Sequence, residues 1–179
     1  MRTCVFFFAF LAALTAARGN AQTGDALKDM PFVTLESGLT HFRPDRNSCA
    51  ELAAYFILND GTDGEYPFED ISKEFADKFG ERPYSLLNLE EIFLQKGLKC
   101  SAAKLKEPSD VFNLDFRHLV LYIPPQGADP IGHFLYCRRI SEGGYAILDP
   151  AAANPVRPKK LTPEYLNRKK WDGILIFIE

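Results

Sequence analysis

The 179-residue sequence lacks several features that point to common functions. It has no basic excess, since 21 Lys and Arg stand against 24 Asp and Glu for a net charge of −3, and this balance does not favour a nucleic-acid partner. It also has no internal repeat, no coiled-coil heptads and no glycine-rich loop of the kind that cradles phosphates. These absences argue against a repeat architecture and against a nucleotide-binding enzyme.

Paired metal-binding motifs are missing as well. The four cysteines include no C-x-x-C pair, and the three histidines include no H-x-x-x-H spacing. The acidic segment 59–64 (NDGTDG) lacks the EF-hand spacing and its closing glutamate. Four residues could in principle bind zinc, although their spacing gives this little support: Cys49, Cys137, His133 and Asp149. We therefore predict no metal site and no cofactor.

The N-terminal apolar run is too short for a confident membrane span. One early arginine, a short apolar stretch and then small residues up to Ala21 are typical of a secretory signal peptide. We predict a signal peptide over residues 1–21, with cleavage after Ala17 as an alternative. The expected destination is the periplasm, the cell surface or the medium, and no integral membrane span is expected after cleavage. The apolar run 174–178 predicts a buried strand.

The chain after residue 21 is long enough for one domain with a sizeable core. Residues 22–37 predict a weakly ordered lead-in, and residues 38–179 predict the folded domain. Export would place Cys49, Cys100 and Cys137 in a compartment that permits disulfides. A bond between Cys100 and Cys137 would spare Cys49, but the sequence leaves the pairing open.

Helices are expected in the first half of the domain and strands in the second. Apolar periodicity predicts helices over 49–58, over 68–79 with Gly80 as the stop, and from about Ser85 to Gly97. A short helix is expected to begin after Thr162. Strands are expected at 98–102, 118–123, 132–140, 145–149 and 174–178. This order predicts an α+β fold in which N-terminal helices pack on a mainly antiparallel β-sheet.

Cys49 stands where a helix start would favour a thiolate. The apolar residues at 49, 52, 53, 56 and 57 follow one helix face, and Ser48 or Asn47 could serve as the N-cap. The sulfur would lie in the first turn, where the helix dipole favours an anion. A thiol in such a position has its pKa lowered from about 8.5. Cys49 is therefore a candidate nucleophile.

His133 and Asp149 are expected to meet across a β-hairpin. The point midway between them falls in the turn formed by residues 141–144 (SEGG), so antiparallel pairing would place them nearly opposite each other. Residues directly opposite have Cβ atoms about 4.5–5.5 Å apart. Asp149 would then hold the His133 ring in the tautomer that accepts the Cys49 proton. Each residue alone is more often structural, and it is their joint order that favours a catalytic triad.

These motifs resemble the bacteriocin-processing, double-glycine leader peptidase family of papain-like cysteine peptidases, in a standalone secreted form. The resemblance covers roughly residues 42–178. It implies a papain-like fold, a peptide or protein substrate and peptide-bond hydrolysis through a thioester. By similarity, Cys49 is the nucleophile, His133 the general base and then acid, and Asp149 the residue that orients His133. The motifs that carry the resemblance are 47–53 (NSCAELA), 132–134 (GHF), 147–151 (ILDPA) and 171–173 (WDG).

Two positions depart from the family pattern. The family has a glutamine six residues before the cysteine, where it donates to the oxyanion, and commonly a glycine directly after the cysteine; here these positions are Arg43 and Ala50. Loss of one oxyanion donor typically costs about 2.7–4 kcal/mol. The candidate donors in this chain are Arg43 and the backbone N–H of Cys49. The alternative function is a catalytically degenerate module that binds peptides without cutting them.

Overall fold

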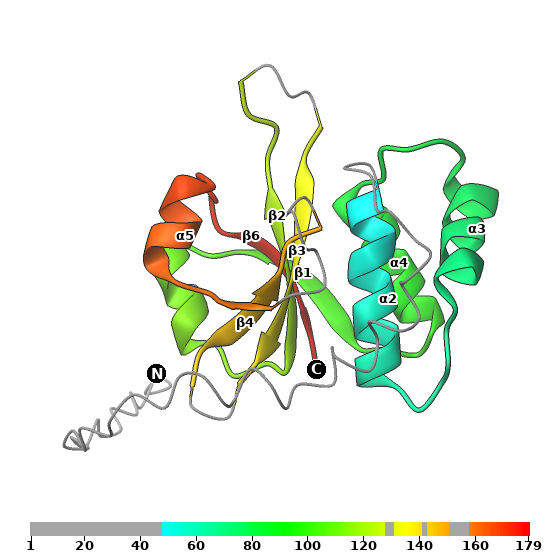
Figure 1. The fold of residues 1–179 in the computed structure, drawn as a ribbon, viewed down its shortest axis with the longest axis horizontal. Coiled ribbons are helices and arrows are strands. Elements are labelled where there is room, and N and C mark those ends of the chain that lie inside the picture. Colours follow the sequence, from blue (N-terminus) through cyan, green and yellow to red (C-terminus); the bar gives the residue numbers. More distant parts are fainter. Residues whose placement is uncertain (1–47, 128–130, 141–142, 151–157) are drawn as a thin grey trace, which may run out of the picture.

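The computed structural model describes residues 48–127, 131–140, 143–150 and 158–179, and these ranges form an α+β fold (Figure 1). The predicted signal peptide, the predicted lead-in and Arg43 lie outside the described residues. The elements follow one another as α2 (Cys49–Gly61), α3 (Phe68–Phe79), α4 (Leu86–Gln95), β1 (Cys100–Lys104), η3 (a 3₁₀ helix, Pro108–Asn113), β2 (His118–Ile123), β3 (His133–Arg139), β4 (Tyr145–Leu148), β5 (Lys159–Lys160), α5 (Pro163–Arg168) and β6 (Ile174–Ile178). The predicted order of helices and strands is confirmed.

The sheet has six antiparallel strands in the order β1-β6-β2-β3-β4-β5. The C-terminal strand β6 therefore lies inside the sheet, between β1 and β2, which explains the apolar run at 174–178. None of the helices in the described ranges is long and apolar enough to cross a membrane. The expectation of a buried strand at the C-terminal end is confirmed.

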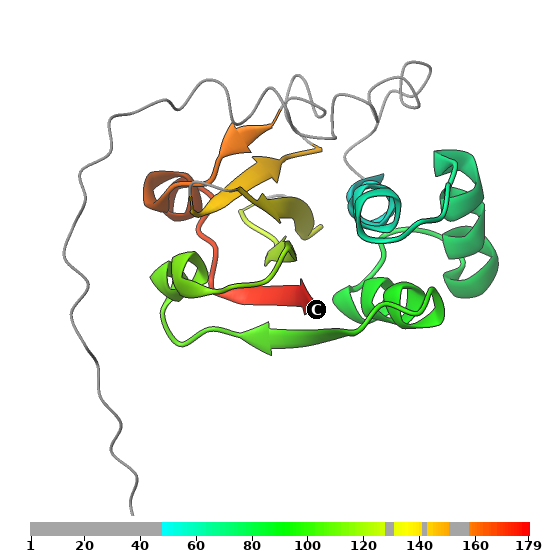
Figure 2. The ribbon, with the colours of Figure 1, turned by 90° about the horizontal axis from the view of Figure 1, so that it is seen from below.

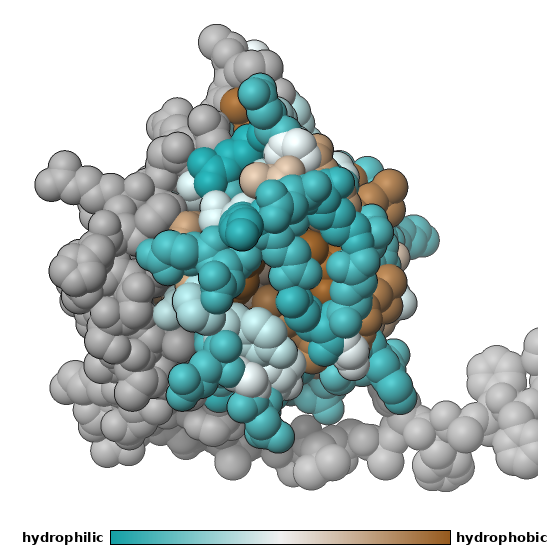
Figure 3. Space-filling view, turned by 90° about the vertical axis from the view of Figure 1, so that its right-hand side faces the viewer, coloured by the Kyte–Doolittle hydropathy of each residue, from teal (hydrophilic) through white to brown (hydrophobic). Residues whose placement is uncertain are grey.

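Helices cover both faces of the sheet (Figures 1 and 2). Helices α2, α3 and α4 lie on one side, while η3 and α5 lie on the other. Strand β4 is buried along its whole length, and β2 is buried at all but one position, because apolar side chains alternate into two cores. The outer surface over the α2–α4 layer is mainly hydrophilic, with apolar residues showing between the polar ones (Figure 3).

Helix α2 is buried on all sides, although its sequence predicts one apolar face. Every residue from Cys49 to Leu58 is buried, since the sheet covers one side of the helix and α3 and α4 pack on the others. Even Glu51 is fully buried, and its carboxylate forms an ion pair with Arg82 Nε at 2.6 Å. A buried charge requires such a partner, so this ion pair ties the start of α2 to the segment that connects α3 to α4.

The helix boundaries follow the capping signals in the sequence. Helix α3 stops at Gly80, whose φ of 77° suits glycine. Ser85 caps α4 in a capping box with Asn88, and the Thr162 hydroxyl accepts a hydrogen bond from the Tyr165 N–H at the start of α5. These three boundaries were expected from the sequence.

Other boundaries differ from the expected ones. Helix α2 continues to Gly61, and its last residues include Asp60, which pairs with Arg138 Nε at 2.7 Å instead of lying in a loop. Strand β1 covers 100–104 rather than 98–102, because the Leu98 N–H is still bonded to the Phe93 carbonyl at the end of α4. The 3₁₀ helix η3 and the two-residue strand β5 were not expected.

Candidate active site

Cys49 is the first residue of α2, as the sequence predicts. Ser48 occupies the N-cap position, but its side chain makes no capping hydrogen bond, and Asn47 lies outside the described residues. Cys49 is only 4% exposed. Its sulfur lies close to the backbone of Phe134, the residue that follows His133, and that backbone group favours the thiolate. The start of α2 is therefore placed beside the start of β3.

The Cys49 thiol is nevertheless held in its protonated form. Burial raises its pKa to about 11, and the nearby Glu51 carboxylate adds to this effect. The backbone groups of Phe134, Cys49 and Ala50 lower the pKa, which is the expected contribution of a helix start, but they do not offset the loss of solvation. The prediction of a lowered thiol pKa is therefore wrong, because α2 is buried on all sides instead of on one face and this loss of solvation outweighs the helix start.

His133 and Asp149 are brought together. His133 Nε2 lies 2.7 Å from Asp149 Oδ1. The strand register pairs Tyr136 with Leu148, so one further step places Asp149 opposite Leu135 rather than opposite His133. The contact is thus a diagonal one across the hairpin, two residues away from the expected alignment but on the same face of the sheet.

Asp149 is surrounded by donors. Its Oδ2 accepts hydrogen bonds from the Tyr165 hydroxyl and from Lys169 Nζ, both at 2.7 Å. Burial by itself would raise the pKa of Asp149, but the bonds from His133, Lys169 and Tyr165 outweigh it and hold the pKa well below its usual range. Asp149 is therefore an anion wherever the protein is folded near neutral pH. Sequence reasoning missed Tyr165 and Lys169, which approach from a helix that carries no motif pointing to this site.

The three predicted residues lie around the first residues of β3 but are not joined in one hydrogen-bonded chain. In the described part of the molecule, no hydrogen bond links Cys49 to His133. His133 uses Nε2 for Asp149, so Nδ1 is the ring nitrogen through which it could accept the thiol proton. The arrangement contains a thiol, an oriented imidazole and a buried carboxylate, which are the groups needed for nucleophilic acyl transfer.

The three described cysteines are free thiols. Cys100 lies on β1 and Cys137 on β3, with β6 and β2 between them. Neighbouring strands are about 4.8 Å apart, so these cysteines are separated by roughly 14 Å, well beyond the ~7 Å that a disulfide spans between Cα atoms. Cys137 also faces the α5 side, whereas Cys49 packs in the core on the α2 side. No cluster of metal-binding side chains is found within the described residues.

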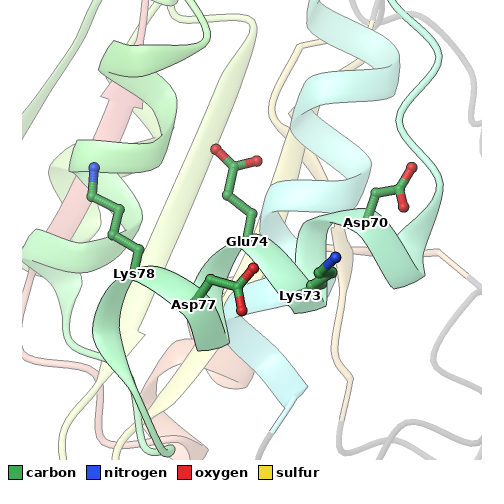
Figure 4. Close-up of a pocket in the computed structure, with 5 residues that line it drawn as sticks. All are labelled: Asp70, Lys73, Glu74, Asp77 and Lys78. Atoms are coloured by element: carbon green, nitrogen blue, oxygen red, sulfur yellow. The ribbon is translucent and has the colours of Figure 1, made fainter.

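An open hollow on the outside of α3 offers no comparable chemistry (Figure 4). Two of its side chains form ion pairs. Lys78 pairs with Glu91 on α4 at 2.8 Å, and Glu74 pairs with Lys96, the C-cap of α4, at 2.7 Å. These charges hold the two helices together at the surface. The hollow is lined by Asp70, Lys73, Glu74, Asp77 and Lys78.

Comparisons with known proteins support the fold. No family model and no curated protein sequence matches the chain. Among solved structures, the peptidase domain of Streptococcus ComA, a bifunctional ABC transporter involved in quorum sensing, matches with a TM-score of 0.55 and 17% identity, over 75% of this chain and 92% of that one. A double-glycine-motif protease from an AMS/PCAT transporter, solved with a leader peptide, matches with a TM-score of 0.53 and 18% identity, over 73% and 82% of the two chains. The described residues therefore share the papain-like fold of double-glycine peptidase domains.

Proposed function

We propose that this protein is an exported cysteine peptidase in which Cys49, His133 and Asp149 form the catalytic triad. The observation that carries the proposal is the 2.7 Å bond between His133 Nε2 and Asp149 Oδ1, made beside the helix start that holds Cys49. A carboxylate on one imidazole nitrogen fixes the tautomer and leaves the other nitrogen to act as base. Along the sequence the three residues follow one another as Cys49, His133 and Asp149, which is the order of a papain-like triad.

The reaction would proceed through a thioester. His133 takes the Cys49 proton, and the sulfur attacks the carbonyl carbon of the peptide bond. His133 then returns the proton to the amide nitrogen as the C–N bond breaks, which releases the amine product. Water, activated by the same imidazole, cleaves the thioester and restores the thiol. Asp149 stays ionised throughout and stabilises the imidazolium that forms in each step.

The oxyanion requires donors near the Cys49 sulfur. The N–H groups at a helix start have no partner within the helix, and Cys49 supplies one of them. Arg43 is proposed as the second donor in place of the family glutamine. It lies outside the described residues, so this assignment rests on its position in the sequence.

The proposed substrate is a peptide or an extended protein segment. One of the similar structures was solved with a leader peptide, and this supports a peptide as the substrate class here. Export by a signal peptide over residues 1–21 would bring the enzyme to peptides outside the cytoplasm. The proposal names only this class of substrate, a peptide, and does not extend to a leader sequence.

A second candidate function is a peptide-binding module without turnover. The observation that favours it is the burial of Cys49, whose raised pKa and lack of a bond to His133 describe an unreactive thiol. For the enzyme to act, the thiol and the imidazole have to come together, and the rate of Cys49 alkylation reports whether they do. Both functions use the same site, and they differ in whether peptide bonds break.

Turnover of a peptide library by the mature protein separates the two functions. We expect cleavage products in the wild-type protein and none with Cys49→Ala, while Cys100→Ala, which removes a free thiol on the distant strand β1, retains activity. If both Cys49→Ala and the wild-type protein bind peptides without cleaving any, the enzyme proposal is wrong and the binding module is correct.

A further inference from the structure

Lys169 stands against the proposed catalytic carboxylate. Its Nζ lies 2.7 Å from Asp149 Oδ2, on the oxygen opposite to the one that binds His133. The Asp149 side chain is 12% exposed and the Lys169 side chain 29% exposed, so the ion pair is largely shielded from solvent. Such a pair interacts far more strongly than one at the open surface.

The position of Lys169 is fixed by several contacts. It is the C-cap of α5, and its N–H is bonded to the Tyr165 carbonyl at 3.0 Å. Its own carbonyl accepts a hydrogen bond from the Gln126 side chain, which comes from the connection between β2 and β3. Its ammonium group also lies 5.6 Å from the centre of the Tyr165 ring. Lys169 is therefore built into the site rather than being a mobile surface lysine.

We propose that Lys169 is a positioning residue that holds Asp149 in place and partly neutralises its charge, so that the Cys49–His133 pair is restrained from forming its charged state. This inference rests on the proposed function, because it takes Cys49 and His133 as the reacting pair.

The physical reason is that His133 and Lys169 share the negative charge of the Asp149 carboxylate. When His133 takes the thiol proton it becomes a cation, and its stabilisation depends on the negative charge of Asp149. Lys169 brings a positive charge to the same carboxylate and so reduces the negative potential at the imidazole. The thiol is then expected to stay protonated more readily than it would beside an Asp149 without Lys169.

Other side chains lie near Cys49, His133 and Asp149 and contribute to the surroundings of these residues. Glu51 on α2 raises the pKa of Cys49, and Tyr165 on α5 donates to Asp149. Arg168 lies over the Tyr165 ring, 5.3 Å from its centre, on the side of α5 that carries the donor. Tyr122 on β2 packs against Gly132, next to His133. Lys169 brings a permanent positive charge into direct contact with Asp149, so a change there isolates the proposed effect.

Iodoacetamide labelling of Cys49 near neutral pH, followed by mass spectrometry, tests the inference. Lys169→Met is expected to label about tenfold faster than wild type, since without the ammonium group the full negative charge of Asp149 stabilises the His133 imidazolium. Lys169→Arg keeps the charge and is expected to label like wild type. Lys160→Met, which removes an exposed lysine on β5, serves as the matched control. A folded Lys169→Met protein that labels no faster than wild type would overturn the inference.

A carbon NMR titration of the Asp149 carboxyl gives a readout that needs no reactivity at Cys49. The ion pair predicts a pKa below the ordinary Asp range in the wild-type protein and a rise in Lys169→Met, with no rise in Lys160→Met. An Asp149 pKa that is the same in all three proteins overturns the inference. Failure of the proposed function appears separately, as labelling of Cys49 that does not depend on His133.

Discussion

The surroundings of Cys49 and those of Asp149 are opposite in character. Cys49 lies at the start of a helix whose first ten residues are all buried, where loss of solvation keeps its thiol neutral. Asp149 is also largely shielded but is hydrogen-bonded to His133, Tyr165 and Lys169, so it remains charged. Burial alone therefore does not decide ionisation in this protein. Hydrogen bonds and an ion pair outweigh burial at Asp149, whereas the backbone groups around Cys49 do not offset it.

The two surroundings come from the two sides of the sheet. The α2 side provides helix packing and buried ion pairs such as Glu51 with Arg82 and Asp60 with Arg138. The α5 side provides Tyr165 and Lys169 from a short capped helix. His133 is the first residue of β3. It contacts Asp149, and the backbone of the next residue, Phe134, lies close to the Cys49 sulfur. Its role in the proposed mechanism is to take the proton from Cys49 and return it to the leaving amine, while Asp149 stays ionised.

Replacing Asp149 with asparagine should have the largest effect on this contrast. The Asp149→Asn change would leave Lys169 facing a neutral amide, and the imidazolium of His133 would lose the negative charge that stabilises it. We expect kcat/KM for peptide cleavage to fall by about 10²–10⁴. Asp172→Asn, in a more exposed ion pair with Lys104, is the control and should leave kcat/KM unchanged. Equal activity of Asp149→Asn and wild type would remove Asp149 from the mechanism.

Removing Arg82 should disturb the α2 side. Arg82→Ala leaves the fully buried Glu51 carboxylate without this ion pair, and breaking a buried pair costs about 3 kcal/mol of folding free energy. The matched change Lys104→Ala, in the exposed pair with Asp172, should cost less than about 1 kcal/mol. Urea unfolding measures both. Similar losses in the two variants would show that the Glu51–Arg82 pair is not shielded in solution.

Acid should weaken the α5 side first. The folded-state pKa of Asp149 lies below its value of about 3.9 in an unfolded chain, so the bonds to this carboxylate stabilise the fold above that pH. Their contribution of about 2 kcal/mol is lost as the pH falls below about 4. Thermal unfolding between pH 2 and 7 should therefore show a shallower pH dependence in Asp149→Asn than in wild type. Parallel curves would contradict the strong pairing of Asp149.

The smallest predicted effect concerns the cap of α5. Thr162→Ala removes the hydroxyl that accepts from the Tyr165 N–H and should cost about 1 kcal/mol in urea unfolding. Thr162→Ser keeps the acceptor and should be close to wild type. A loss in Thr162→Ser as large as that in Thr162→Ala would assign the effect to packing of the methyl group instead of capping.

The sequence predicts much of the fold because its signals are local. Gly80, the Ser85 cap and the Thr162 cap set helix ends, and a short apolar run followed by two prolines sets the strand His118–Ile123. It also predicts the meeting of His133 and Asp149, because a hairpin turn fixes which residues come near each other. The burial around Cys49 depends on how α3 and α4 pack on α2, and no local pattern contains that information.

Tyr165 and Lys169 were missed for a related reason. They reach Asp149 through the crossing of α5 over the sheet, and their spacing from Asp149 in the sequence carries no periodic signal. The same tertiary packing explains why Cys100 and Cys137 are free, since the insertion of β6 and β2 between their strands depends on the sheet order. Long-range contacts of this kind decide the electrostatics of the site.

The rate of Cys49 alkylation across pH in wild type and in His133→Ala tests the central claim most directly. If the two residues act as a pair, wild-type Cys49 reacts with iodoacetamide near neutral pH despite its burial, and the rate falls in His133→Ala to that of an isolated buried thiol. If Cys49 is unreactive until strongly alkaline pH, or if its rate is the same with and without His133, the catalytic triad is contradicted.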